Sequence, residues 1–332
     1  MMRLLPALML SIILILQASA EEEARGRVDF QVMRISMGAR SSGMGEACVG
    51  MADDISSLSL NPAGLSGVDS PQLMASHYEW FGGMRYEWIG FAQPIADLFT
   101  AAASISYLHS PPDITTVESN SGAWGYAEGG TFRYYDTLLQ IGFGTMPLMN
   151  VRLGATFKLA RSGTSFEGTP SPMPEYKRRG SSLSFGIIYE TPLPELKVGV
   201  CYRDVKLNAE GFSSKTATLP TEIAVGMSYR LRFKARRRTV AESGSPPENS
   251  LILACEADLP SSGSNLFRLG AEYQMANGFS LRMGYRTDPD RSGLSRLSGG
   301  IGYKSGNYQI DYAFISYGEL GDVHRASLTI SF

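Results

Sequence analysis

Side chains suited to acid–base, metal or nucleophilic chemistry are few in this chain of 332 residues. The three histidines, His77, His109 and His324, do not stand at metal-ligand spacing from one another or from a cysteine. The sequence contains no Gly-x-Ser-x-Gly turn and no phosphate-binding glycine loop. We therefore expect a protein that is not an enzyme and that uses neither a metal nor another cofactor.

Two weaker signals for chemistry have simpler explanations. Residues 288–293, Asp-Pro-Asp-Arg-Ser-Gly, loosely resemble a calcium-binding loop, but we favour a plain hairpin turn. The three cysteines, Cys48, Cys201 and Cys255, are an odd number and lie too far apart to suggest a disulfide framework. We expect them to be small buried hydrophobic residues.

Charged residues on one face of alternating segments are the more informative set. An unpaired buried charge is costly, so we interpret these residues as paired charges that brace a wall and hold a plug. A path for ions or solutes is the alternative. Asp53 and Asp54 are the expected partners for the arginines. The set comprises Arg152, Lys158, Arg203, Glu222, Arg268, Glu272, Arg282, Arg286, Asp311 and Arg325.

Segments with period-2 alternation place these charges on strands. Each has apolar residues on one face and polar or small residues on the other. Leu281, Leu328 and Ile330 are examples of the apolar face, which we expect to contact lipid. The predicted strands, about fourteen, lie near residues 72–81, 84–95, 99–109, 131–146, 150–161, 180–191, 196–206, 221–232, 249–258, 265–275, 278–287, 296–304, 307–314 and 323–332.

The connections between these strands alternate in length. Those near 96–98, 147–149, 276–277 and 305–306 are short, whereas those at 110–130, 162–179, 207–220 and 288–295 are long. Short periplasmic turns and long extracellular loops are typical of an outer-membrane barrel, and a β-sandwich has no reason to show them. The sequence therefore predicts an all-β protein, a transmembrane antiparallel β-barrel.

One long connection breaks this alternation. It follows residue 233 and carries Arg236, Arg237 and Arg238. Since the later turns remain short on the expected side, we place this basic loop in the periplasm. There it would dock an anionic partner, or it is a solvated insertion.

The N-terminal region has two parts. Residues 1–20 combine Arg3, a short apolar run and a small-residue cleavage site, which predicts a cleaved signal peptide and export. Residues 21–71 form the predicted plug, and residues 72–332 the barrel. Met44, Cys48, Met51, Ile55 and Leu58 recur at helical spacing, which predicts a short helix. Asn61-Pro62-Ala63-Gly64 then predicts a turn in which Gly64 tolerates the left-handed region.

Both ends of the mature chain resemble one family. At the N-terminal end the matching residues are Gly38-Ala39-Arg40, Gly43-Met44-Gly45, Ala52-Asp53-Asp54 and Asn61-Pro62-Ala63-Gly64-Leu65. At the C-terminal end they are Tyr312-Ala313-Phe314, His324-Arg325 and Ser327-Leu328, before the final Phe332. This pattern resembles the PorV/PorQ family of outer-membrane barrels, relatives of the FadL transporters. The resemblance implies a fourteen-stranded barrel with the N-terminal segment inside it.

The resemblance also implies a location and possible functions. We expect a protein of the outer membrane of a diderm bacterium, surrounded by outer-membrane lipid and inserted by the barrel-assembly machinery, with Phe332 as its C-terminal signal. The first hypothesis is a component of type IX-like secretion that binds a secretion component or secreted cargo. The alternative is a FadL-like channel for a hydrophobic ligand, and a purely structural barrel is a third. A net charge of −2 gives no indication of nucleic-acid binding.

Overall fold

The computed structural model describes residues 30–96, 98–118, 126–168, 176–210, 218–233, 248–287, 297–318 and 321–332. The predicted signal peptide, the basic residues Arg236, Arg237 and Arg238, and the segment 288–293 lie outside these residues. The predictions made for them therefore remain predictions.

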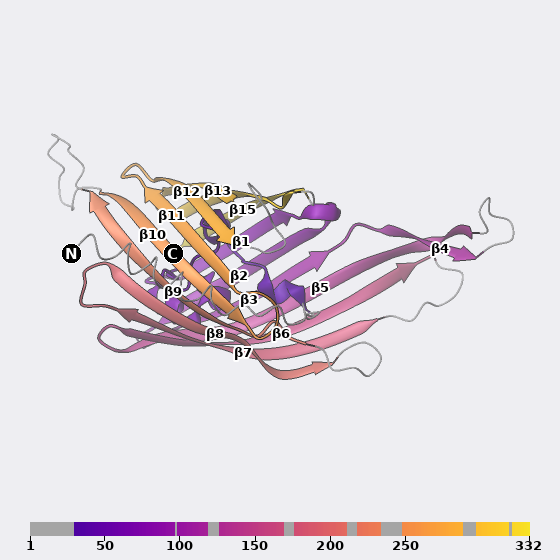
Figure 1. Cartoon of the computed structure of the whole chain (residues 1–332), viewed down its shortest axis with the longest axis horizontal. Coiled ribbons are helices and arrows are strands. Elements are labelled where there is room, and N and C mark those ends of the chain that lie inside the picture. Colours follow the sequence, from indigo (N-terminus) through magenta and orange to yellow (C-terminus); the bar gives the residue numbers. More distant parts are fainter. Residues whose placement is uncertain are drawn as a thin grey trace.

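Alternating apolar and polar residues build one large antiparallel sheet, as predicted. Its fifteen strands have the order β3-β2-β1-β15-β14-β13-β12-β11-β10-β9-β8-β7-β6-β5-β4, and a further pairing of β3 with β5 closes it into a barrel (Figure 1). All strands except β4 belong to this closed ring. The strands are β1 (Gln72–Glu79), β2 (Arg85–Ile95), β3 (Phe99–His109), β4 (Asp113–Glu118), β5 (Tyr126–Leu148), β6 (Val151–Glu167), β7 (Lys177–Glu190), β8 (Leu196–Glu210), β9 (Glu222–Phe233), β10 (Asn249–Pro260), β11 (Leu266–Gln274), β12 (Phe279–Thr287), β13 (Leu297–Ser305), β14 (Tyr308–Ser316) and β15 (Asp322–Ser331).

The connections define two ends of the barrel. Short turns at 96–98, 149–150, 275–278 and 306–307 lie at one end, which we call the short-turn end. The opposite end, called the long-loop end, carries the connections that the sequence predicts to be extracellular. Phe233 and Asn249 pair with each other on either side of the basic loop. Asn249 Oδ1 accepts a hydrogen bond from the amide of Ala276 at 2.8 Å, so this loop starts and ends at the short-turn end, as predicted.

The wall differs from the prediction at the long-loop end. The connection predicted at 110–130 contains β4 and the beginning of β5, and β6 and β7 extend into the connection predicted at 162–179. These strands project well beyond the rest of the barrel (Figure 1). Polar, charged and glycine residues outnumber the apolar ones there, so the regular alternation that marks a membrane strand is absent although the backbone continues to pair.

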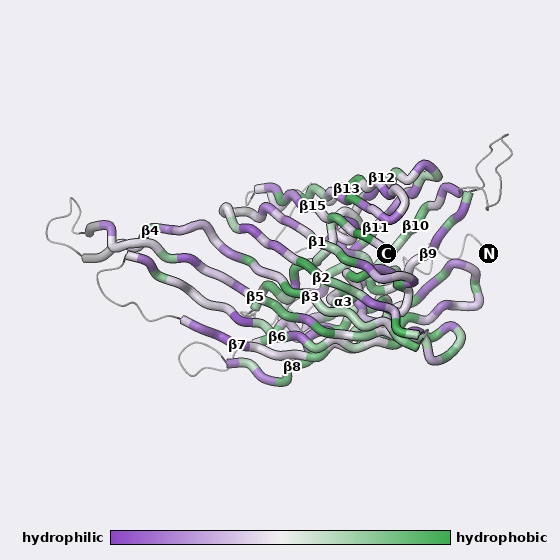
Figure 2. Tube along the Cα trace, turned by 180° about the vertical axis from the view of Figure 1, so that it is seen from behind, coloured by the Kyte–Doolittle hydropathy of each residue, from purple (hydrophilic) through white to green (hydrophobic). Residues whose placement is uncertain are grey.

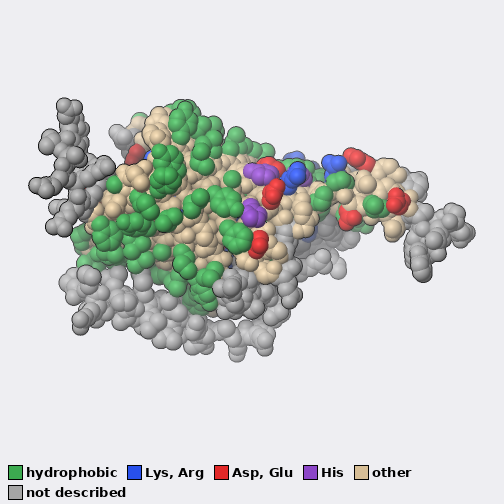
Figure 3. Space-filling model, turned by 90° about the horizontal axis from the view of Figure 1, so that it is seen from above, with side chains coloured by type: hydrophobic (Ala, Val, Ile, Leu, Met, Phe, Trp, Pro, Cys, Tyr) green, Lys and Arg blue, Asp and Glu red, His purple; other side chains and the backbone are tan. Residues whose placement is uncertain are grey.

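An apolar surface covers the outside of the barrel. Hydrophobic side chains gather over its body, whereas charged side chains follow toward the projecting end (Figure 3), and the hydropathy of the trace shows the same division (Figure 2). Leu281 is 50% exposed and Leu328 is 40% exposed, as expected for residues that contact lipid. Among the described residues no helix is long and apolar enough to cross a membrane.

Residues 30–68 pack inside the barrel. They contain η1 (Gln31–Arg34), α2 (Ala39–Gly43), α3 (Ser57–Leu60) and η2 (Pro62–Gly67). Outside this segment, the short helix η3 (Phe81–Gly83) joins β1 to β2. Helix α2 contacts β12 to β15, whereas η2 contacts β3, β5, β6 and β7 on the other side. We call residues 30–68 the inner segment.

The helix predicted from Met44 to Leu58 is not continuous. Gly45 and Glu46 both have a φ of 64°, and this left-handed backbone ends the helical path after α2. The five residues of the predicted stripe are nevertheless all buried, Met44, Cys48 and Met51 in one cluster and Ile55 and Leu58 in another. Burial therefore explains their hydrophobicity without a helix.

Candidate functional site in the barrel lumen

The Asn-Pro turn fastens the inner segment to the wall. The Asn61 amide nitrogen donates to the carbonyl of Val49 at 2.8 Å and to that of Ile187, on β7, at 3.3 Å. Its oxygen accepts from the Ala63 amide at 3.2 Å and so caps η2, which begins at Pro62, where a missing N–H costs nothing. One buried side chain thus orders the turn and joins it to the barrel.

A row of glycines makes room for this turn. Gly144, Gly154 and Gly186 lie opposite one another on β5, β6 and β7. A Cβ atom at any of them would overlap residues of the inner segment, among them Asn61 and Pro62. Gly64 has a different role from the predicted one, because its φ is not left-handed. It is required because a Cβ there would overlap Ala52.

Arg40 links the inner segment to the wall. Its Nε and Nη2 donate to the two carboxylate oxygens of Glu272, on β11, at 2.9 Å each. Its Nη1 contacts Asp53 at 2.6 Å and Asp54 at 3.3 Å. The main partner of both aspartates is therefore Arg40, in the same segment, and not a wall arginine as predicted. Only Arg230 of the described wall approaches, at 3.8 Å from Asp53.

Electrostatics and burial act in opposite directions on these groups. Burial lowers the pKa of Arg40, but Asp53 and Glu272 raise it by more, so this pKa lies well above its ordinary value. Burial raises the pKa of Asp54, and the attraction to Arg40 offsets only part of that effect. Arg40 thus stays charged, and the pKa of Asp54 lies above its ordinary value.

The wall charges form a buried network around this link. Glu272 also binds Arg282 at 2.5 Å, and Arg282 binds Asp311 at 2.7 Å. The further pairs are Arg203 with Glu222 (2.8 Å) and Glu256 (2.9 Å), Arg268 with Asp258 (2.6 Å), Glu46 with Arg286 (2.8 Å) and Arg325 (3.3 Å), Lys158 with Asp204 (3.0 Å) and Arg152 with Glu190 (2.5 Å). Each predicted lumen charge therefore has a partner of opposite sign.

Several members of this network were not predicted. Glu256 accepts hydrogen bonds from the amides of Cys48 and Val49 at 2.8 Å each, so it also holds the inner segment. The alternation of β10 would have placed Glu256 and Asp258 on the lumen side. Arg40 and Glu46 lie in the irregular inner segment, where no periodicity indicates which way a side chain points.

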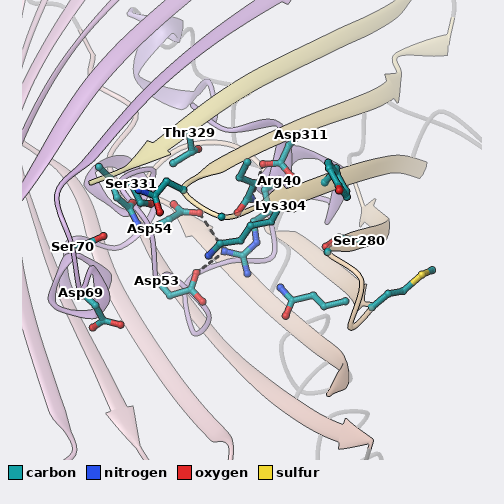
Figure 4. Close-up of a pocket in the computed structure, with 18 of the residues that line it drawn as sticks. Arg40, Asp53, Asp54, Asp69, Ser70, Ser280, Lys304, Asp311, Thr329 and Ser331 are labelled. Atoms are coloured by element: carbon teal, nitrogen blue, oxygen red, sulfur yellow. Dashed lines mark hydrogen bonds and ion pairs between the residues drawn. The ribbon is translucent and has the colours of Figure 1, made fainter. Parts of the chain in front are cut away.

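A polar cavity of about 800 Å³ lies at the short-turn end beside Arg40, Asp53 and Asp54. Lys304, Asp311 and Ser331 line it from the strands, and the two aspartates point toward Arg40 (Figure 4). Charges of both signs line this cavity. In the described part of the chain no group of His, Cys, Asp or Glu residues is arranged to hold a metal ion.

The other side of the lumen is apolar. Tyr78 and Tyr86 stack with ring centroids 5.2 Å apart, and the Arg325 guanidinium lies 4.7 Å from the Tyr78 centroid. Buried apolar residues of β1, β2, β3, β5 and β6 continue this surface and pack on the inner segment: Met74, Trp88, Ala92, Ala102, Leu108, Leu138 and Ala160. We call this side the apolar half, although Lys158 of β6 is also buried there and pairs with Asp204 of β8. We call the side lined by β8 to β15 the ionic half. The sequence prediction of a polar lumen missed the apolar half.

The cysteines and the irregularities in strand pairing change this description of the lumen little. All three cysteines are free, Cys48 and Cys201 buried and Cys255 half-buried. The β7–β8 ladder shifts register near Asp204, which has a φ of 56°. The described strands otherwise pair around the whole ring. The wall that the structure describes therefore shows no lateral gap.

Comparison with known proteins gives one family match and several similar structures. Residues 12–158 match the model of the family described as Uncharacterised protein family (UPF0164). No curated protein matches the chain.

The similar structures share the fold at low sequence identity. The toluene transporter TbuX of Ralstonia pickettii is 13% identical with a TM-score of 0.60, over 90% of this chain and 98% of that one. The toluene transporter TodX of Pseudomonas putida is 12% identical with a TM-score of 0.56, over 89% and 98%. A FadL homologue of Pseudomonas aeruginosa is 12% identical with a TM-score of 0.50, over 90% and 99%.

These similarities bear on the family predicted from the sequence. They support the FadL-type part of the resemblance, and none of them points to PorV/PorQ or to type IX secretion. The chain has the fold of the FadL-type outer-membrane β-barrels.

Proposed function

We propose that this protein carries small hydrophobic molecules across the outer membrane through its lumen. The observation that carries the proposal is the apolar half, whose buried apolar residues, from Met74 on β1 to Ala160 on β6, form one cluster with the inner segment. The lumen of a barrel that conducts ions or sugars is polar, so an apolar interior surface favours an apolar cargo. The similarity to structures described as toluene transporters supports the same substrate class.

Passage requires the inner segment to move. Ile55, Leu58 and Leu65 are fully buried against the apolar half and occupy the space that a cargo would need. Apolar contacts have no fixed direction, so a hydrophobic molecule can replace these side chains at small cost. The cargo would thus enter between the inner segment and the strands of the apolar half, β1, β2, β3, β5 and β6.

Uptake of radiolabelled toluene by cells that lack their own FadL-type transporter tests this function. Cells that express the protein should accumulate toluene faster than cells with an empty vector. Ala160→Phe, on the lumen side of β6, should reduce the rate about tenfold, because a phenyl ring fills the apolar half. The matched control is Leu159→Phe. The side chain of residue 159 points to the lipid side, so this substitution should leave uptake unchanged.

Surface levels of both variants should be measured on a gel with and without heating. Equal uptake by expressing and empty-vector cells would refute the transport function. Equal uptake by Ala160→Phe and the unmodified protein, at equal surface levels, would place the path elsewhere.

The projecting part of the wall favours a second candidate, the binding of a protein outside the membrane. Strands β4 to β6 project from the body of the barrel (Figure 1), beyond the part of the trace where hydrophobic residues gather (Figure 2), so lipid cannot cover them there. A partner-binding role is what the PorV/PorQ resemblance implies. Replacing residues 113–132 with a short turn should abolish crosslinks to secreted proteins under this function, whereas toluene uptake should continue.

A further inference from the structure

The outer surface changes from apolar to charged along one row of residues. Glu87, Tyr107, Thr137, Arg161 and Arg179 lie opposite one another, in this order, on β2, β3, β5, β6 and β7. Two residues nearer the short-turn end, the corresponding row contains Ile89, Ile105, Leu139, Leu159 and Ser181. The first row therefore marks the edge of the apolar surface toward the long-loop end.

The charged residues at the two ends of the first row have different neighbours. Glu87 lies between two histidines, 3.5 Å from His77 and 3.6 Å from His109. Arg161 and Arg179 instead stand directly opposite each other on adjacent strands, and both are exposed. Like charges in such a cross-strand pair destabilise a sheet.

The arginine pair has little compensation from its neighbours. Neither arginine makes an ion pair or side-chain hydrogen bond within the part of the chain that the structure describes. Thr137, beside Arg161, is neutral, and exposed Glu210 is the register neighbour of Arg179 on β8. One carboxylate beside two guanidinium groups leaves a net positive charge on this part of the outer surface.

We propose that Arg161 and Arg179 bind the phosphate of an anionic lipid headgroup in the outer leaflet. A phosphate placed between two guanidinium groups accepts paired hydrogen bonds from both and removes their repulsion. The position favours a lipid over a free anion, because Phe157, Leu159 and Leu183 lie directly below the arginines on the same outer face. The acyl chains of a lipid would cover these residues while its phosphate reaches the arginines.

Vesicles of defined composition test this binding with the full chain. The protein is reconstituted in phosphatidylcholine alone, whose phosphate is already balanced by its own choline cation, or with added phosphatidic acid, whose phosphate is anionic. The temperature at which the protein loses its heat-modifiable gel mobility is then measured. Phosphatidic acid should raise this temperature by about 2–4 °C, the shift that roughly 1 kcal/mol of stabilisation gives in a large domain. Arg161→Gln and Arg179→Gln should each abolish the rise. In phosphatidylcholine alone both variants should be at least as stable as the unmodified protein, because the repulsion is gone.

Arg85 provides a matched control. It is an exposed, outward-facing arginine on β2 near the same edge, but its register neighbours are Glu79 and His109 rather than another arginine. Arg85→Gln removes one charge as well and should retain the full rise. Arg161→Lys keeps the charge without the paired donors and should retain only part of it.

Two results would overturn the proposal. One is an equal rise in Arg161→Gln, Arg179→Gln and the unmodified protein, which would place lipid binding elsewhere. The other is an equal rise from inorganic phosphate added to phosphatidylcholine vesicles, which would identify a free-anion site instead of a lipid site.

Discussion

The two halves of the lumen hold the same inner segment by different kinds of interaction. In the ionic half, charged side chains such as Glu256, Glu272 and Arg325 bind it through contacts of 2.8 to 3.3 Å. In the apolar half, Leu58 belongs to the same buried apolar cluster as Leu138 and Ala160, and such contacts have no fixed direction. Neutral hydrogen bonds add to them: Thr156 of β6 donates to the Leu58 carbonyl at 2.9 Å, and Ser76 of β1 donates to the Met37 carbonyl at 2.7 Å. An ion pair that loses one partner leaves a buried unpaired charge, whereas an apolar contact accepts any apolar replacement.

This difference assigns separate tasks to the two halves. The ionic half fixes where the inner segment sits, and the apolar half is the side from which a hydrophobic molecule can displace it. A segment held by hydrophobic contacts alone would be released by any apolar solute. A segment held by ion pairs on every side would not be displaced by an apolar solute. The following predictions test the division, from the largest expected effect to the smallest.

Glu272→Gln should have the largest effect on stability. It removes the carboxylate shared by Arg40 and Arg282, and Glu272 is fully buried. Breaking a buried pair by removing one partner costs about 3–5 kcal/mol. The free energy of unfolding in urea, followed by the heat-modifiable gel shift, measures this loss. Glu195→Gln is the control, since its partner Arg232 has 57% of its side chain exposed and about 0–1 kcal/mol is expected. Equal losses in both variants would contradict the structural role of the ionic half.

Leu281→Arg tests the boundary between inside and outside on which the comparison depends. Leu281 faces outward, while the next residue, Arg282, lies in the ionic half with 1% of its side chain exposed. An arginine on the lipid side costs about 2–4 kcal/mol at the bilayer midplane and about 0–1 kcal/mol near an interface, so Leu281→Arg, two residues after the start of β12, should cost an amount between these values. Membrane fractionation and the same unfolding measurement check this prediction. A soluble periplasmic protein, or a variant of unchanged stability, would argue against the lipid-facing assignment.

Leu58→Ala should destabilise the apolar half in a way that a ligand reverses. Truncation of a fully buried leucine costs about 2–5 kcal/mol, and we expect the lower end because neighbouring lumen side chains can relax. Toluene should restore part of the lost stability by occupying the space that is left, and it should restore nothing in Glu272→Gln. Rescue of both variants, or of neither, would remove the distinction between the halves.

More of the barrel fold than of the lining of the lumen could be predicted from the sequence. Turn lengths and the alternation around Leu281 and Leu328 predict the barrel, because lipid and lumen impose opposite polarities on adjacent residues. The same rule fails where the lumen is apolar. In β2, Tyr86 and Trp88 face inward while Ile89 and Phe91 face outward, so both faces carry large apolar residues.

Within the inner segment, tertiary contacts rather than periodicity decide the arrangement. Arg40 binds Glu272 across 232 residues of sequence, a pairing that no local pattern indicates. The turn at Asn61 was predictable from its residue types, but its fit against Gly144, Gly154 and Gly186 depends on the register of three strands. Strand β4 was missed because its pairing with β5 lies beyond the apolar surface, where the membrane no longer imposes a pattern.

The smallest stability effect is expected for the double variant Asp53→Ala, Asp54→Ala. About a quarter of each side chain is exposed, at 27% and 24%, so solvent screens their attraction to Arg40. The bidentate bond from Arg40 to Glu272 remains, and we expect a loss on the order of 1 kcal/mol or less.

The same double variant should change conduction far more than stability. Both carboxylates border the polar cavity at the short-turn end and contact Arg40 there (Figure 4). Without them the loop that follows Ala52 loses its charged contact to Arg40, and the lumen should leak ions. Planar-bilayer conductance of the folded barrel measures the leak. Asp69→Ala is the matched control, because Asp69 lines the same cavity but is exposed and has no ion pair in the described chain. If the double variant folds normally and conducts no better than Asp69→Ala, the constriction lies in the apolar half, and the ionic half serves stability alone.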